Sequence, residues 1–258
     1  VMVEQRYGKP IMTSFHALFS LGMMLGGLFG ALFAKLDTSL LLHFSAIAAV
    51  SVAGVLIARY YLIHDKPERK DKEAPAFRLP NAAMVSIGVI AFCCMLGEGA
   101  MADWSTNYME NIAGAEKALA PIGLSAFALA MTLGRFVGDS ARVRFGDRNL
   151  MIICGLISLS GIALAILWMH PYAAITGFFI VGVGLSAVVP IAYSLAGNAR
   201  DLPPGVGLAM VTTVGYSGFL FGPPIIGFLA DLSNLRYAMA LVALLFAVMI
   251  LLAYRHRS

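Results

Sequence analysis

Residues 149–169 read NLMIICGLISLSGIALAILWM, a run of 21 residues without a charged side chain. An α-helix rises about 1.5 Å per residue, so this run spans the roughly 30 Å hydrocarbon core of a bilayer. Lipid offers the backbone no hydrogen-bonding partner, which leaves the helix as the expected form. Seven more apolar runs of 17 to 26 residues occur, and we predict an all-α membrane protein with eight transmembrane helices at 14–34, 38–58, 79–102, 118–134, 149–169, 172–197, 205–230 and 237–254.

The composition of the whole chain agrees with a membrane protein. Hydrophobic residues fill 60% of the 258 positions and charged residues 12%, against about 25% charged residues in soluble domains. This excludes a soluble enzyme and a nucleic-acid-binding domain. The chain has no HExxH, GxSxG or GxxxxGK[ST] pattern, so we predict that it is not an enzyme. Cys93, Cys94 and Cys154 lack partners at metal-ligand spacing, and we predict no metal and no cofactor.

Lysine and arginine are distributed unevenly between the connections of the predicted helices. Fifteen of the 18 lie on one side, and the other side holds only Lys35, Lys117 and Arg236. Cytoplasmic loops are enriched in these residues. We therefore predict a multi-pass protein of the cytoplasmic (inner) membrane, with both ends of this chain in the cytoplasm.

A charged segment divides the predicted helices into two groups. Residues 64–80 read HDKPERKDKEAPAFRLP, with nine charges and three prolines, which is typical of a solvated linker. Residues 22–36 (GMMLGGLFGALFAKL) align without gaps with residues 218–232 (GFLFGPPIIGFLADL), which indicates an internal repeat. We predict that residues 1–63 form the last two helices of an N-terminal six-helix bundle, 64–80 a cytoplasmic linker, and 81–258 a complete C-terminal six-helix bundle. On this interpretation four further helices precede Val1.

Small residues and prolines in the repeated segments predict close helix packing. Glycines spaced along one helix face let a neighbouring helix approach, and adjacent prolines remove backbone donors and favour a bend. Tight structural packing and a bend that moves during a transport cycle both remain open for Gly22, Gly26, Gly30, Gly218, Gly222, Pro223 and Pro224.

The connection between the fourth and fifth predicted helices carries the strongest motif. Residues 134–148 read GRFVGDSARVRFGDR, which resembles the G-x-x-x-(G)-D-x-x-x-x-R-x-G-x-R signature of the major facilitator superfamily. The resemblance implies a cytoplasmic gate in which Asp139 pairs with Arg144 or Arg148 and faces the N-terminus of a helix from the other half, here at Thr13 and Ser14. The gating residues are then Gly134, Arg135, Gly138, Asp139, Arg142, Arg144, Gly146 and Arg148. The alternative is an ordinary basic loop on the cytoplasmic side.

Further segments extend this resemblance over nearly the whole chain. Residues 14–22 (SFHALFSLG), 97–104 (GEGAMADW) and 213–224 (TVGYSGFLFGPP) are similar to the sugar (fucose) permease-related branch of bacterial inner-membrane transporters. The resemblance implies helices 5–12 of a twelve-helix fold and secondary active transport of a small polar solute by alternating access, with a sugar as candidate solute and proton symport as candidate coupling. The expected partners are the solute and the lipid bilayer, with no nucleic acid and no obligate protein partner. The alternative is a non-transporting remnant or a structural membrane module.

Candidate solute-binding or proton-coupling residues lie within or beside the predicted spans. Glu98 stands out because a carboxylate at the bilayer centre costs roughly 2.5–3.5 kcal/mol, so a cavity, a cation or a proton should compensate it. A structural hydrogen bond is the alternative for Glu98 and for His16, a solvated interface position for Asp103, and ordinary packing for the aromatic residues. The candidates are His16, Phe19, Glu98, Asp103, Trp104, Tyr193 and Tyr216.

Overall fold

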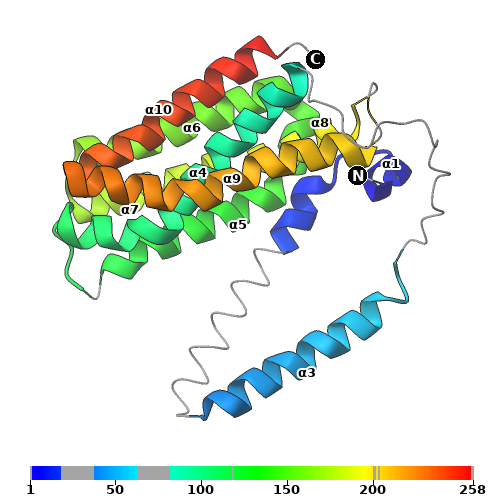
Figure 1. Ribbon diagram of the computed structural model, residues 1–258, viewed down its shortest axis with the longest axis horizontal. Helices are drawn as coiled ribbons and strands as arrows, with labels where there is room; N and C mark the ends of the chain where they lie inside the picture. The colour runs from blue at the N-terminus through cyan, green and yellow to red at the C-terminus, as the bar shows by residue number, and fades with distance from the viewer. Residues whose placement is uncertain are drawn as a thin grey trace. The chain divides into compact units, whose positions relative to one another are not determined.

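The computed structural model describes residues 2–18, 38–62, 82–117, 119–199, 202 and 204–256, and every regular element in these ranges is an α-helix (Figure 1). The chain divides into two compact units, Val1–Ser20 with Pro80–Ser258, and Leu21–Leu79. The helical structure of the described residues confirms the predicted all-α fold. The linker at 64–80, Phe19, Gly22, Gly26 and Gly30 lie outside the described residues.

The described helices follow the predicted spans in order. A stretch at residues 12–18 is the described beginning of the first predicted span. Seven described helices are long and apolar enough to cross a membrane, with α7 and α8 together forming one of them. The labelled helices are α1 (Met2–Tyr7), α3 (Leu40–Ala58), α4 (Ala82–Asn111), α5 (Ala120–Phe145), α6 (Asp147–Leu167), α7 (Pro171–Leu185), α8 (Val188–Gly197), α9 (Pro204–Leu232) and α10 (Leu235–Arg255).

Helix α5 extends further than the sequence predicted. Its predicted end is residue 134, but it runs to Phe145 and therefore carries most of the motif at 134–148 on a helix instead of a loop. Hydropathy marks only the membrane-crossing part of a helix, and the polar residues that follow continue it. The residue that follows and caps the helix is Gly146, whose φ of 75° lies in the left-handed region that favours glycine. Helix α6 begins at the next residue, so Gly146 makes the sharp turn of the motif.

The predicted helix at 172–197 is interrupted. Helix α7 ends at Leu185 and α8 begins at Val188, with a turn between them. Pro190 lacks a backbone N–H and therefore cannot bond to the carbonyl of Ser186. The thiol of Cys94 on α4 donates to the carbonyl of Leu185 at 3.7 Å, which supplies a buried partner where the regular helix ends.

Helix α4 lies at the centre of the larger unit. It packs most extensively along α9, as Figure 1 also shows, and it contacts α5, α7, α8 and α10. A Cβ atom at Gly218 would lie 2.6 Å from the Phe92 carbonyl, and one at Gly222 would lie 2.8 Å from Leu96 Cγ. Only glycine permits this approach of α9 to α4. Helix α9 continues through Pro223 and Pro224 to Leu232.

Helix α3 belongs to the smaller unit. Its N-terminus is capped by the hydroxyl of Ser39, which accepts a hydrogen bond from the backbone N–H of Leu42 at 3.3 Å. The helix has a mean hydropathy of 2.3, and none of its residues is buried in the described part of the chain. An apolar surface of this kind suits a helix that faces lipid or other helices.

Candidate functional site

One face of α5 carries three of the six charged residues of the motif at 134–148. Gly138, Asp139 and Arg142 follow Arg135 after three, four and seven residues, respectively. With 3.6 residues per turn, these spacings place all four on the same side of the helix. This face therefore presents two arginine side chains, one aspartate side chain and, at Gly138, a position without a side chain.

The carboxylate of Asp139 binds the N-terminus of a helix that is distant in sequence. Its Oδ1 accepts a hydrogen bond from the backbone N–H of Thr13 at 3.1 Å, and its Oδ2 accepts from the N–H of Ser14 at 2.9 Å and from the Ser14 hydroxyl. The first N–H groups of a helix have no partner within the helix, and here the N–H of Phe15 makes the first bond, to Ile11. Asp139 thus caps this helix end, where a negative charge is favoured.

Gly138 lets the helix at residues 12–18, whose N-terminus is capped by Asp139 and which is called the capped helix below, approach α5. Thr13 is only 1% exposed, and a Cβ atom at Gly138 would overlap its Cγ2 and lie 3.1 Å from its Cβ. The two backbones can therefore approach closely enough for Asp139 to reach the N–H groups of Thr13 and Ser14.

Replacing Gly138 by valine should force Thr13 away from α5. Inserting carbon atoms into a packed contact costs typically 1–3 kcal/mol, and we expect the melting temperature to fall by about 3–10 °C. Differential scanning fluorimetry of the purified protein measures this shift. The matched control is Val137→Ala at the adjacent, 63% exposed position; an equal shift in both variants would contradict the role of Gly138.

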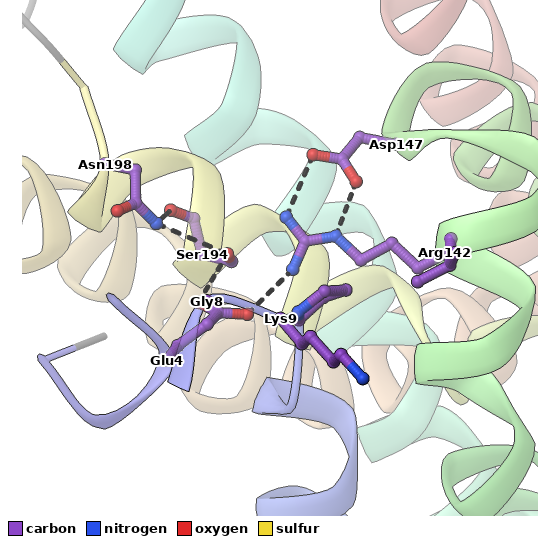
Figure 2. Close-up of a pocket in the computed structure, with 9 residues that line it drawn as sticks. Glu4, Gly8, Lys9, Arg142, Asp147, Ser194 and Asn198 are labelled. Carbon is purple, nitrogen blue, oxygen red and sulfur yellow. Dashed lines mark hydrogen bonds and ion pairs between the residues drawn. The ribbon is translucent and has the colours of Figure 1, made fainter. Parts of the chain in front are cut away.

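A second polar contact joins the N-terminal segment to the same end of the bundle. Arg142 donates from Nη2 to Asp147 Oδ2 at 2.9 Å, from Nε to Asp147 Oδ1, and from Nη1 to Glu4 Oε1 at 3.0 Å. The hydroxyl of Ser194 donates to Glu4 Oε2 at 2.8 Å. Figure 2 shows Glu4 between Arg142 and Ser194, so that this network links α1, α5, α6 and α8.

A pocket of about 390 Å³ adjoins this network (Figure 2). Its walls carry charges of both signs, and the amide of Asn198 donates to the Ser194 carbonyl at 2.8 Å. The pocket therefore lies where the N-terminal segment meets α5, α6 and α8. It is lined by Glu4, Gly8, Lys9, Pro10, Arg142, Val143, Asp147, Ser194 and Asn198.

The remaining motif residues have other partners. Arg148 donates to the carbonyl of Tyr254 at 2.7 and 3.1 Å, near the end of α10, and the exposed Arg144 stacks over Phe145, 5.6 Å from the ring centroid. The pairing that we expected between Asp139 and either arginine is not formed among the described residues. The carboxylate is turned instead toward the backbone of the capped helix.

Gly134 contacts the break between α7 and α8. A Cβ atom at this position would lie 2.7 Å from Ser186 Cβ and would also overlap the Ser186 hydroxyl. The first glycine of the motif therefore allows α5 to pack directly on the turn that separates the two helices.

Glu98 and Arg135 form an ion pair between α4 and α5. Glu98 Oε2 lies 3.6 Å from Arg135 Nη2, and the two side chains are 15% and 8% exposed. The thiol of Cys94 approaches Glu98 Oε1 at 3.8 Å. The cation that compensates the charge of Glu98 is therefore Arg135, which was predicted from the sequence as a gating residue.

Two more of the predicted candidates lie beside this pair. His16 is on the capped helix, with Nδ1 3.0 Å from the Met12 carbonyl and its ring centroid 5.9 Å from that of Tyr193. It is within electrostatic reach of Arg135 and Asp139. Tyr193 on α8 donates its hydroxyl to Met95 Sδ at 3.7 Å. The structure therefore gathers Glu98, Arg135, His16 and Tyr193 in one region of the larger unit.

Tyr216 on α9 adjoins this group. It is exposed, its side chain lies within hydrogen-bonding reach of Tyr193, and its ring centroid is 6.3 Å from that of Phe219. Asp103 and Trp104 lie outside the group. Asp103 is exposed on α4, while Trp104 packs against α9, 3.0 Å from where a Cβ atom of Gly227 would be. Both lie well before the end of α4 at Asn111, and not at the helix end that hydropathy predicted near residue 102.

Comparison with known families identifies the fold. A family model described as the Major Facilitator Superfamily matches residues 9–199 and, in a second overlapping match, residues 87–258. The chain belongs to the Major Facilitator Superfamily. This confirms the superfamily that the motif of residues 134–148 suggested, and it agrees with the prediction of a membrane protein that is not an enzyme.

The chain is similar to several bacterial members of the Major Facilitator Superfamily or related membrane proteins. It is 38% identical over 95% of its length to an uncharacterized MFS-type transporter of Yersinia pestis, 33% identical over 97% to an uncharacterized transporter of Sinorhizobium fredii, and 33% identical over 84% to the membrane protein MosC of Rhizobium meliloti. It spans 63%, 67% and 54% of these three proteins.

Solved structures of the Major Facilitator Superfamily share the fold. The crystal structure of the transporter FucP in the outward conformation matches with a TM-score of 0.81 and 19% identity over 96% of this chain and 68% of that one. A structure of the E. coli fucose:proton symporter FucP matches with a TM-score of 0.61 and 20% identity over 69% of this chain and 44% of that one.

Neither Glu4 nor the Arg142–Asp147 pair was predicted from the sequence. Glu4 precedes the first predicted span in a polar segment, and no spacing connects it with Arg142 or Ser194, which lie 138 and 190 residues away. The pair of Arg142 and Asp147 could have been predicted from the sequence, because a spacing of five residues across the Gly146 turn brings the side chains together.

Proposed function

We propose that this protein is a secondary active transporter that moves a small polar solute across the cytoplasmic membrane by alternating access. The contact between Asp139 and the helix end at Thr13 and Ser14 is its cytoplasmic gate. This contact is the observation that carries the proposal. Both oxygens of one carboxylate are used to bind a helix end more than 120 residues away in sequence.

The chemistry of the contact suits a gate. The interaction joins a side chain to an otherwise unsatisfied helix end, so it can be released without breaking bonds within either helix. In the predicted repeat the capped helix and α5 belong to different halves of the transporter. When the halves separate on the cytoplasmic side, water replaces Asp139 at Thr13 and Ser14. The contact therefore stabilises one of two states.

The pair of Glu98 and Arg135 is proposed as the centre of the solute site. A carboxylate accepts hydrogen bonds and a guanidinium donates them, so the pair offers both functions to the hydroxyl groups of a sugar. Intramembrane ionisable residues commonly mark solute or proton pathways. The fold shared with FucP, a fucose:proton symporter, supports a sugar as the first solute class and protons as the first coupling ion to be tested.

Uptake by the protein expressed from its complete gene tests the proposal. We expect proteoliposomes to take up at least one member of a panel of sugars and other polar solutes with saturable kinetics. Uptake should increase when a pH gradient, acidic outside, is imposed. Liposomes without protein and a collapsed gradient are the controls. Absence of saturable uptake across the panel, from protein that is inserted and folded, would contradict the transport proposal.

A further inference from the structure

Glu98 is contacted through both oxygens of its carboxylate. Its Oε2 lies 3.6 Å from Arg135 Nη2 on α5, and its Oε1 lies 3.8 Å from the thiol sulfur of Cys94, one turn earlier on α4. A contact on each oxygen holds the plane of the carboxylate as well as its position. Cys94 therefore helps to orient the central group of the proposed solute site.

The same thiol also reaches the end of α7. Its sulfur lies 3.7 Å from the carbonyl oxygen of Leu185, the last residue of that helix, and Cys94 is fully buried. The last carbonyls of a helix have no partner within it. A Cβ atom at Gly97 would lie 2.6 Å from Phe246 Cε1 and 3.4 Å from Leu185 Cδ1, so this glycine allows α4 to pack closely against α10 and the end of α7.

The direction of the Cys94 thiol differs from that of most short polar side chains inside a helix. Hydroxyl groups commonly donate to the carbonyl four residues earlier on their own helix, as Thr132 does to Ala128 at 2.9 Å. The thiol of Cys94 instead approaches a carboxylate and the carbonyl of another helix. Its orientation therefore matches these two acceptors and not the backbone of α4.

We propose that Cys94 is a positioning residue for Glu98, and that solute binding turns its thiol hydrogen toward Leu185. A thiol has one hydrogen to donate, so the two acceptors compete for it. Bonds to an ionised group are roughly twice as strong as neutral ones, so the carboxylate holds the hydrogen before the solute binds. A solute hydroxyl that takes Glu98 Oε1 releases the hydrogen to the carbonyl of Leu185. The inference rests on the proposed function, because it places Glu98 in the solute site.

Infrared spectroscopy of the S–H stretching band tests this contact without requiring transport. The band of Cys94 is isolated by subtracting the spectrum of Cys94→Ala from that of the wild type, and the same subtraction is made in each further variant. A stronger hydrogen bond lowers the stretching frequency, so Glu98→Gln should shift the band to a higher frequency. Glu110→Gln, which neutralises an exposed carboxylate on the same helix, should leave it in place. An unshifted band in Glu98→Gln would overturn the proposal.

Uptake kinetics separate positioning of Glu98 from simple packing. The matched variants are Cys94→Ala and Cys93→Ala, because both thiols are fully buried on the same helix and both changes remove the same sulfur atom. For the sugars of the uptake panel, Cys94→Ala should raise KM about threefold to tenfold at an unchanged maximal rate, the effect of one lost hydrogen bond on solute binding. Cys93→Ala should keep the wild-type KM.

The possible outcomes distinguish this proposal from the proposed function. Equal KM values in Cys94→Ala and Cys93→Ala would mean that Cys94 only packs, and would overturn the proposal. KM does not depend on the amount of folded protein, so a lower yield of one variant does not affect the comparison. Absence of uptake by the wild type would contradict the proposed function, and the S–H band would then decide whether Cys94 binds Glu98.

Discussion

Replacing Asp139 by asparagine is expected to lower the rate of solute uptake at least tenfold without preventing insertion into the membrane. Asparagine keeps one acceptor oxygen, but its amide group meets the N–H groups of Thr13 and Ser14 with further donors, and the negative charge at the helix end is lost. A hydrogen bond to a charged group contributes about 1.5–3 kcal/mol. Its loss shifts the balance between the two gate states by roughly 10- to 100-fold.

Initial uptake rates in proteoliposomes, normalised to the amount of inserted protein, measure this effect. The matched control is Asp231→Asn, which removes an exposed carboxylate near the end of α9. We expect the control to keep the wild-type rate. An Asp139→Asn protein with unchanged uptake would show that the contact with Thr13 and Ser14 does not limit transport.

Replacing Glu4 by glutamine is expected to release the N-terminal segment from the bundle. Glu4 is 7% exposed and satisfies both Arg142 and Ser194. Glutamine can still accept the hydrogen bond from Ser194, but it lacks the negative charge that Glu4 offers to Arg142. Arg142 then keeps Asp147 as its charged partner. Breaking a buried charged contact by removing one partner is strongly unfavourable. We expect trypsin to cleave after Arg6 about tenfold faster than in the wild type.

Cleavage is followed by mass spectrometry of the released peptide at short digestion times. Glu116→Gln provides the control, because Glu116 is exposed in the turn before α5. Equal cleavage rates in the Glu4→Gln and wild-type proteins would mean that α1 is held by its apolar contacts and not by Arg142.

The membrane spans could be predicted from the sequence because hydropathy is a local property. A run such as residues 149–169 needs no knowledge of its neighbours, and α6 occupies Asp147–Leu167 as a result. Helix ends were predicted less well. Helices α4 and α5 continue past their apolar parts to Asn111 and Phe145, since the backbone hydrogen bonds of a helix do not depend on the polarity of its side chains.

The sequence also placed Asp139 and Glu98 among the candidate residues, but it did not identify all of their partners. A lone carboxylate in an apolar run indicates that some compensation exists, and Arg135 was not distinguishable from the other arginines of the motif. Arg142 binds Glu4 and Asp147, whereas Arg148 binds the carbonyl of Tyr254 near the end of α10. These choices depend on which helices are neighbours.

The sequence by itself thus determined the all-α membrane class, the order of the helices and the position of the motif, because each follows from residues that are close together along the chain. Only the tertiary structure decided that Glu98 meets Arg135 and that Glu4 meets Arg142 and Ser194. Each of these contacts joins elements far apart in sequence. Burial makes an unpaired charge or an unsatisfied backbone group costly, and the packed helices determine which partner can compensate it.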